Sequence, residues 1–242
     1  MPGPVNRIQG AQVDGWWACL GARLCPSRCL VCGEAAARGT DLCAACAAGL
    51  PWNDAACPRC ALPVPAPAGP CGACLQRPPP LQAAHAAFRY AAPLDRLLPR
   101  FKFHRDLAAG RLLSTAMAIR FAALGRPDAL LAVPLHHARL RQRGYDQALE
   151  LARPLARALQ LPLLAGALVR QRATRAQSEL DAAARRRNLR GAFAVPEGGA
   201  LPAHVVLVDD VMTTGATLHA AAIALRRAGV ARVDAWVCAR VP

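Results

Sequence analysis

The chain has 242 residues, enough for one large domain or two smaller ones, and 54% of them are apolar, so we expect a folded protein with a real core. Its formal charge of +15 favours polyanionic partners, and all of its basic residues except Lys102 are arginines. An Arg-rich, Ala-rich composition can reflect the genome, but that does not account for the net charge. The sequence has no apolar run long enough to cross a membrane and no signal-peptide pattern, so we expect no integral membrane segment and a cytoplasmic location.

The first 28 residues predict a short lead-in helix. Trp16, Trp17, Leu20 and Leu24 have the spacing of one apolar stripe. A role at a membrane surface is the alternative, but no basic face accompanies the stripe. We therefore expect this segment, residues 1–28, to pack on the protein itself.

The next stretch, residues 29–76, contains four C-x-x-C pairs separated by ten residues each. The pairs are Cys29/Cys32, Cys43/Cys46, Cys57/Cys60 and Cys71/Cys74. Two such pairs make a tetrahedral sulfur cage of the size that zinc prefers. Disulfides do not suit a reducing compartment, and iron–sulfur clusters use other spacings. The pattern predicts a double zinc-ribbon-like domain with one or two structural Zn²⁺ ions, bound by sequential pairs or by an interleaved arrangement.

Zinc would also supply folding energy that so short a segment cannot obtain from a core. Two Zn(Cys)₄ sites would lower the formal charge from +15 to about +11, which leaves the chain strongly basic. Cys19, Cys25 and Cys238 lie outside the pattern; Cys25 competes with Cys29 as a ligand, and Cys238 lies in an apolar run expected in the core. A Pro-rich stretch, Pro78 to Pro80, predicts a stiff linker and a domain boundary near residue 80.

Residues 77–242 alternate between strand and helix patterns. We expect strands at 86–90, 128–135, 163–169, 193–195, 205–208 and 232–240, with helices at 93–103, 144–161 and 218–228. Pro154 should kink or end the second of these helices. The alternation predicts an α/β fold: a mainly parallel sheet with helices on both faces.

The most informative stretch begins at His204. Four apolar residues, Val205 to Val208, predict a buried strand, and Asp209 and Asp210 follow it directly. A loop rich in Thr and Gly then leads into a helix. Carboxylates at the carboxyl end of a parallel strand suit sugar hydroxyls or a magnesium-bound water, and a helix N-terminus suits phosphate. The alternative without a binding function is an ordinary turn in which the two acids cap the helix.

This stretch resembles the phosphoribosyl-pyrophosphate (PRPP) motif of the type I phosphoribosyltransferases. The resemblance implies that Asp209 and Asp210 are the catalytic pair that holds the ribose hydroxyls. It also implies a cradle for the 5′-phosphate made of Val211, Met212, Thr213, Thr214, Gly215, Ala216 and Thr217.

The order of motifs along the chain is similar to that of the ComF/GntX family, in which a zinc-ribbon head precedes a phosphoribosyltransferase-like domain. The four cysteine pairs, the Arg141–Gln147 stretch RQRGYDQ, the 177–193 segment and the PRPP motif follow one another in the family's order. The resemblance implies a pyrophosphate-binding loop at 133–137 and a catalytic loop at 170–190. The pyrophosphate-binding residues would be Leu135, His136, Arg139 and Arg143.

Two classes of function follow. The first is a Mg²⁺-dependent phosphoribosyltransferase that binds PRPP and acts on an unidentified acceptor, since expelling pyrophosphate needs carboxylates near the ribose and cations near the leaving group. The second is a non-catalytic protein that binds single-stranded DNA, because the family is linked to DNA uptake in natural transformation and possible partners include competence machinery proteins. The chain is poor in aromatics, so DNA binding would depend on phosphate contacts. A third reading is a fold that has lost catalysis and senses PRPP as a signal.

Overall fold

The computed structural model describes residues 27–37, 39–65, 69–172, 191–196, 198 and 200–242. The lead-in helix at 1–28, Cys19, Cys25 and most of the Arg-dense 170–190 segment lie outside these residues. The chain divides into two compact units, Met1–Gly49 and Leu50–Pro242. This division falls between the second and third cysteine pairs, whereas the sequence placed a boundary near Pro80.

The smaller unit is held by backbone hydrogen bonds around its two cysteine pairs. The Cys29 N–H donates to the Glu34 carbonyl at 2.7 Å, and the Leu30 N–H donates to the Asp41 carbonyl at 2.9 Å. A short helix, α2 (Ala44–Ala48), begins directly after Cys43. Among the described residues of this unit, only the Cys29 and Leu42 side chains are buried, which fits a fold that depends on metal ligation.

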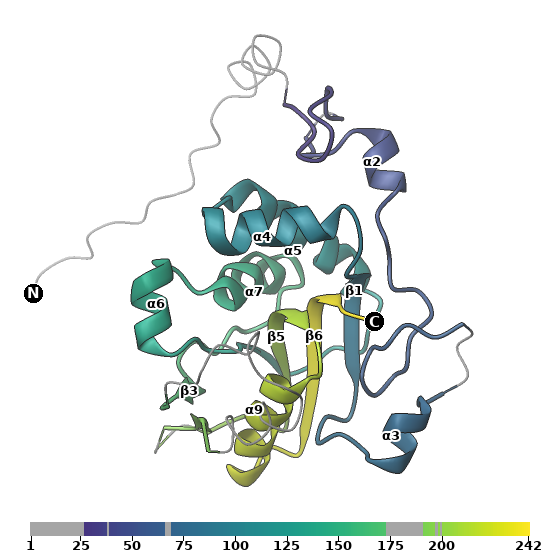
Figure 1. The fold of residues 1–242 in the computed structure, drawn as a ribbon. Helices are drawn as coiled ribbons and strands as arrows, with labels where there is room; N and C mark the ends of the chain where they lie inside the picture. Colours follow the sequence, from purple (N-terminus) through teal and green to yellow (C-terminus); the bar gives the residue numbers. More distant parts are fainter. Residues whose placement is uncertain (1–26, 38, 66–68, 173–190, 197, 199) are drawn as a thin grey trace, which may run out of the picture. The chain divides into compact units, whose positions relative to one another are not determined.

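The larger unit is built on a parallel sheet with the strand order β1-β6-β5-β2. These strands are β1 (Ala84–Arg89), β2 (Ala129–Ala132), β5 (His204–Met212) and β6 (Arg232–Arg240). The two long strands β5 and β6 lie at the centre, with Val208 opposite Trp236 (Figure 1). Both are buried along most of their length, which explains their continuous apolar runs.

Helices cover both faces of this sheet, as the sequence predicted. Phe121 of α5 (Leu107–Phe121) stacks on Trp236 at 5.0 Å, so α5 lies on one face. Val205 and Leu207 point to the other face and share a core cluster with Leu218 and Leu225 of α9 (Ala216–Arg227). The remaining helices are α3 (Gly72–Gln76), α4 (Leu94–His104), α6 (His137–Arg143) and α7 (Gln147–Ala158).

Three expectations about elements need correction. Helix α7 runs through Pro154, because the proline removes a single backbone bond while Leu151 and Leu155 stay fully buried. The expected strand at 163–169 is mostly irregular: Leu163 makes one bridge to Leu130, and regular pairing is limited to β3 (Val169–Arg170) against β4 (Phe193–Ala194). The sequence pattern did not predict helix α5. In the structure, Asp106 caps this helix by accepting from the Ala109 N–H at 3.0 Å.

The second cysteine group is part of the larger unit and packs on the sheet. The Arg240 Nε donates to the Cys60 carbonyl at 2.9 Å, and the Ala84 N–H donates to the Pro58 carbonyl at 3.0 Å. Ala61 is fully buried in the same core cluster as Val205 and Leu207. The third and fourth cysteine pairs are therefore built into the fold of the sheet domain.

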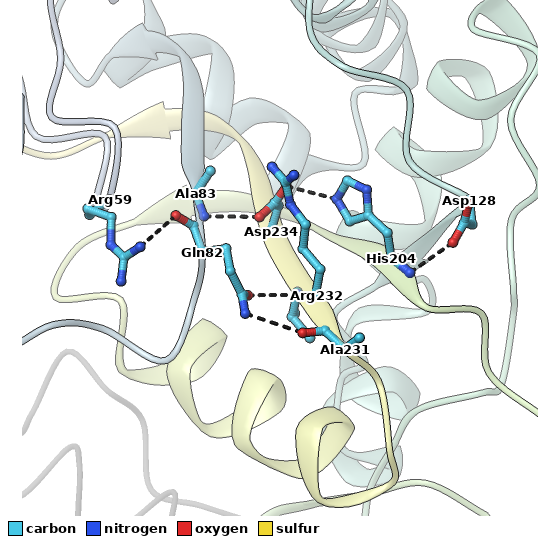
Figure 2. Close-up of polar contacts among 9 residues, drawn as sticks. Arg59, Gln82, Ala83, Asp128, His204, Ala231, Arg232 and Asp234 are labelled. Carbon is cyan, nitrogen blue, oxygen red and sulfur yellow. Dashed lines mark hydrogen bonds and ion pairs between the residues drawn. The ribbon is translucent and has the colours of Figure 1, made fainter.

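A polar network ties the amino ends of the strands together (Figure 2). Asp234 of β6 accepts from the Ala83 N–H at 3.0 Å and lies 2.8 Å from His204 Nε2. Arg232 donates to the same carboxylate at 3.0 Å. This network lies at the opposite end of β5 from Asp209 and Asp210, so it supports the sheet and leaves the carboxyl end open for a ligand.

Candidate functional site

The acidic pair, Asp209 and Asp210, lies near the carboxyl end of strand β5. Strand pairing continues past it, since Val211 lies opposite Ala239 and Met212 opposite Arg240. Asp210 is buried, and its Oδ2 lies 2.8 Å from the Nζ of Lys102 on α4. The Asp210 N–H in turn donates to Asp209 Oδ1 at 2.8 Å. The pair is thus held rigidly at the carboxyl edge of the sheet.

The surroundings of the acidic pair disfavour ionisation of Asp209. Burial raises the pKa of Asp209 well above its usual value, and the negative charge of Asp210 raises it further. The cation of Lys102 acts in the opposite direction. A bound cation or the hydroxyls of a sugar would relieve this repulsion, which is the behaviour expected of a ligand site.

The loop after β5 leads directly into the N-terminus of helix α9 (Ala216–Arg227). Because the strand includes Val211 and Met212, the open part of the loop is Thr213 to Gly215, and both threonines are exposed. Gly215 has a φ of 75°, and a Cβ there would lie 2.6 Å from the Met212 side chain, so no other residue fits without strain. Helix α9 begins at Ala216, and its N-cap residue, Gly215, has no side chain to accept from the N–H groups of the first helical turn, which point toward the loop.

The Arg141–Gln147 stretch is a turn between two helices. Gly144 ends α6 with a φ of 82°, and Asp146 caps α7 by accepting from the Leu149 N–H at 3.1 Å. The other oxygen of Asp146 accepts from the Leu135 N–H at 3.0 Å. Burial raises the pKa of Asp146, and the charge of Asp210 adds to the shift. Asp146 therefore fixes the loop at 133–137 beside the acidic pair.

A cavity of about 430 Å³ brings these parts together. It is lined by residues that the sequence predicted from separate motifs: Leu135, Arg139, Arg143, Asp209, Asp210, Val211 and Thr217. We call this cavity the β5 cleft. Segments some 75 residues apart in sequence thus meet at the carboxyl end of the sheet, where ligands of open α/β folds bind.

His136 has a different role in the structure. Its Nδ1 accepts from the Ala138 N–H at 3.2 Å, so it caps α6, and its ring lies 4.0 Å from that of His137. It is buried and is absent from the described lining of the β5 cleft. Burial lowers the pKa of His136, and the nearby positive groups lower it further, so the neutral ring suits capping. The assignment of His136 to pyrophosphate stays a prediction.

The cleft also contains residues that motif reading did not select. These are Lys102, Phe103, Asp146 and Gln147, while a fifth lining residue, Arg170, begins the predicted 170–190 catalytic loop. Burial lowers the pKa of Arg170, whose guanidinium lies 5.4 Å from the Phe193 ring centroid. The signal that pointed to Lys102 is its uniqueness: a chain with one lysine among 30 basic residues places that lysine against the acidic pair.

The cysteines form two separate groups of four. One contains Cys29, Cys32, Cys43 and Cys46, the other Cys57, Cys60, Cys71 and Cys74, and within each group the sulfurs lie within 4.8 Å of one another. Two sulfur pairs, Cys32–Cys43 and Cys60–Cys71, are both 3.7 Å apart. A tetrahedral site with Zn–S bonds of about 2.3 Å has edges of about 3.8 Å. The pairing is therefore sequential, and both groups fit a structural zinc ion.

The acid–base chemistry of these thiols agrees with a cation site. Burial alone would raise the pKa of Cys29, but the backbone N–H groups of Cys32 and Cys43 outweigh it and bring the pKa to about 6. The pKa of Cys46 is raised to about 12, because it faces the sulfurs of Cys43 and Cys32. Four such thiols cannot all ionise side by side unless a divalent cation neutralises them.

Comparisons with protein families divide the chain into the two parts expected. Residues 21–75 match a double zinc ribbon domain, and residues 146–242 match a phosphoribosyl transferase domain. The second match includes Asp146, the acidic pair and the whole 211–217 loop. None of the helices in the described part of the chain is long and apolar enough to cross a membrane.

Curated relatives match over most of the chain. A DNA utilization protein YhgH of Escherichia coli is 38% identical over 89% of this chain and 97% of its own length. Its counterpart in Salmonella typhimurium is 40% identical, over 82% and 90%. Competence protein F of Haemophilus influenzae is 39% identical over 70% of this chain and 78% of its own. With its two ribbons and its phosphoribosyltransferase fold, the chain belongs to the ComF/GntX family.

Proposed function

We propose that this protein binds PRPP with Mg²⁺ in the β5 cleft and transfers the phosphoribosyl group to an acceptor. The observation that carries the proposal is the meeting of three parts in one cavity: the Asp209–Asp210 pair, Val211 and Thr217 at the two ends of the loop that follows it, and Arg139 and Arg143 of α6. Each part matches one portion of PRPP, namely the ribose, the 5′-phosphate and the pyrophosphate. If Asp209 and Asp210 only capped a helix in an ordinary turn, neither the loop nor the arginines would need to lie in the same cavity.

The residues suit the charge changes of the reaction. As pyrophosphate leaves, positive charge develops on the ribose ring, and the carboxylates of Asp209 and Asp210 stabilise it. Negative charge develops on the leaving group, and Arg139 and Arg143 are cations of the cleft lining that would neutralise it. Lys102, now paired with Asp210, is within reach of the same space.

Magnesium fits the donor set, because carboxylate and phosphate oxygens are its preferred ligands. When bound, Mg²⁺ would neutralise the developing charge on pyrophosphate. Asp209 and Asp210 are the described side chains that would hold it, directly or through water.

Isothermal titration with PRPP and Mg²⁺ tests the proposal. We expect the wild-type protein to bind and the Asp209→Asn/Asp210→Asn variant to lose binding by 100-fold or more. Asp234→Asn is the matched control, since Asp234 is also a buried strand carboxylate but lies at the other end of the sheet. No heat of binding with the wild-type protein would rule the transferase out.

A second function, which can coexist with the first, is binding of single-stranded DNA. The chain's charge of +15 supports it, and the relatives named for DNA utilization and competence suggest a setting in DNA uptake, with competence machinery proteins as partners. Contacts of this kind are mainly to phosphates, so log affinity should fall against log salt with a slope of about −0.7 per phosphate. Binding that does not depend on salt would contradict this role.

The proposal also includes the division of the chain into two domains. We infer a ribbon region at 29–76 and a transferase-like domain at 77–242, although the second ribbon packs on the sheet. The zinc-binding thiols suit a reducing compartment, so we place the protein in the cytoplasm. Limited proteolysis that leaves a zinc-containing 50–242 fragment intact would show which boundary matters for stability.

A further inference from the structure

A buried arginine joins the second cysteine group to the end of strand β5. Arg240, the last residue of β6, is 8% exposed, and its Nε donates to the Cys60 carbonyl at 2.9 Å. Its Nη1 donates to the Met212 carbonyl at 3.2 Å and also to the carbonyl of Val241. One guanidinium therefore contacts both a residue of the second metal group and the residue that precedes the Thr213–Gly215 loop.

The buried charge of Arg240 needs compensation. Among the described residues, its acceptors are backbone carbonyls, and no carboxylate lies within ion-pair distance of it. The cost of burying a cation falls when opposite charge lies close. A zinc ion bound by the four thiolates of the second cysteine group would form a centre with net negative charge, because four thiolates outweigh one divalent cation. The second zinc group therefore suits the role of counter-charge to this guanidinium.

Met212 connects this contact to the loop through its backbone and its side chain. Its carbonyl also accepts from the Val241 N–H at 3.0 Å, so two donors from the end of β6 bind the same oxygen. Its side chain fills the space beside Gly215, where an added Cβ would lie 2.6 Å from the Met212 Cε. A shift of Met212 would therefore move the residue that shapes the loop.

The loop begins where the strand pairing stops. Met212 lies opposite Arg240 in the last pair between β5 and β6, so the position of the loop depends on how firmly this pair is held. Arg59 of the same cysteine group provides a contrast. It donates to the Gln82 carbonyl at 3.1 Å, among the contacts at the amino ends of the strands (Figure 2). That bond ties the group to the sheet but away from the loop.

We propose that Arg240 is a positioning residue that couples the second zinc group to the 213–215 loop, so that zinc in this group raises the affinity of the β5 cleft for PRPP. The effect on PRPP rests on the proposed transferase function, whereas the link between the zinc group and the loop does not. Coupling between two sites is reciprocal. A ligand in the cleft should therefore slow the loss of the second zinc ion.

Hydrogen exchange tests the link without a ligand. Arg240→Met removes the guanidinium, and Arg240→Lys keeps the charge but lacks the fork that bridges two carbonyls. In the zinc-loaded protein, both variants should speed exchange of the 211–219 amides by about fivefold or more, the lower end of typical coupling between sites. The amides of α7 should stay protected, which shows that the fold is kept. Arg59→Met is the matched control and should leave the 211–219 amides unchanged.

Zinc release tests the reciprocal effect. Cys32→Ser breaks the first cysteine group, so the zinc that remains belongs to the second. A zinc-selective chelator then measures its release with and without Mg²⁺ and enough PRPP to saturate each protein. We expect PRPP to slow release by about fivefold or more. This protection should be lost when Arg240→Met is added and kept when Arg59→Met is added.

The outcomes separate this inference from the transferase proposal. If Arg240→Met speeds exchange at 211–219 but the wild-type protein does not bind PRPP, the link stands and the transferase fails. If PRPP binds, but its affinity, the exchange and the zinc release do not depend on Arg240, the link is wrong and the transferase stands. Equal effects of the Arg59 and Arg240 variants, or lost protection of α7 in both Arg240 variants, would also overturn the link, because Arg240 would then only support the fold.

Discussion

The Nζ of Lys102 lies 2.8 Å from Oδ2 of Asp210, which joins helix α4 to the end of strand β5. The single lysine of an arginine-rich chain thus neutralises one member of a carboxylate pair that otherwise repels itself. A compact ammonium can be displaced from one carboxylate and turn to a phosphate more readily than a bidentate guanidinium. Lys102 can therefore hold helix α4 to the end of strand β5 and still release Asp210 to a ligand.

Lys102→Met should lower the free energy of unfolding by about 2 kcal/mol at pH 7.5, because it leaves Asp210 buried without its cation. Asp210→Asn added to it should recover part of this loss, since the uncompensated charge is then gone. Urea unfolding of the two single variants and the double variant measures the coupling. Additive losses would show that the ion pair contributes no stability.

Asp209→Asn should stabilise the protein at neutral pH while it abolishes PRPP binding. Burial and the charge of Asp210 raise the pKa of Asp209, so the folded state holds this proton more tightly than the unfolded chain. Stability is then lost as pH rises from the unfolded pKa through the raised folded pKa. Replacing the carboxyl removes that loss, with a typical gain of about 1 kcal/mol.

The measurement is urea unfolding of wild type and Asp209→Asn between pH 4 and pH 8. The advantage of the variant should grow with pH and vanish near the acid end. Because an asparagine oxygen can still accept from the Asp210 N–H, the geometry of the strand should survive. A variant that is less stable than wild type at pH 8 would contradict the raised pKa.

The two zinc groups should differ in their effect on stability. Cys74→Ser should lower the melting temperature of the larger unit by ten degrees or more, because the second group is tied to the sheet through Arg240 and the Cys60 carbonyl. Cys32→Ser should release one zinc ion and leave that melting transition nearly unchanged, since its group belongs to the smaller unit. Calorimetry with a zinc count on each variant makes the comparison; equal shifts would contradict it.

Asp234→Asn should destabilise the protein by about 1–3 kcal/mol without changing the affinity for PRPP. The Asp234 carboxylate accepts from the Ala83 N–H and from Arg232 and also contacts His204. The asparagine amide cannot satisfy all three partners (Figure 2). Thermal unfolding and titration with PRPP on the same sample check both parts. Reduced PRPP affinity would mean that strain passes along β5 to the cleft.

Much of the site could be predicted because it is encoded in short local patterns. The apolar run before Asp209 fixed the buried strand, and the cysteine spacing fixed both metal groups. The parallel sheet and its covering helices were confirmed, because in these elements the local apolar pattern agrees with the burial in the folded structure. The pyrophosphate and phosphate roles of individual residues stay predictions.

What could not be predicted depends on contacts between distant segments. Periodicity cannot show that Lys102 reaches Asp210 or that Asp146 holds the Leu135 N–H, because neither pair is close in sequence. The stretch at 163–169 looked like a strand because its leucines are apolar, yet its pairing with β2 is limited to the single Leu163–Leu130 bridge, and Gly166 has a left-handed φ of 82°. Burial of Leu151 and Leu155 overrode Pro154 in α7, where local rules predicted a break.

The measurement that tests the central claim most directly is a crystal structure of the protein with PRPP and Mg²⁺. The account predicts the ribose hydroxyls on Asp209 and Asp210, the 5′-phosphate within the Thr213–Thr217 loop, and the pyrophosphate facing Arg139 and Arg143, with Lys102 moved off Asp210. A complex with PRPP bound away from the β5 cleft, or with the Lys102–Asp210 pair intact beneath it, would contradict that account.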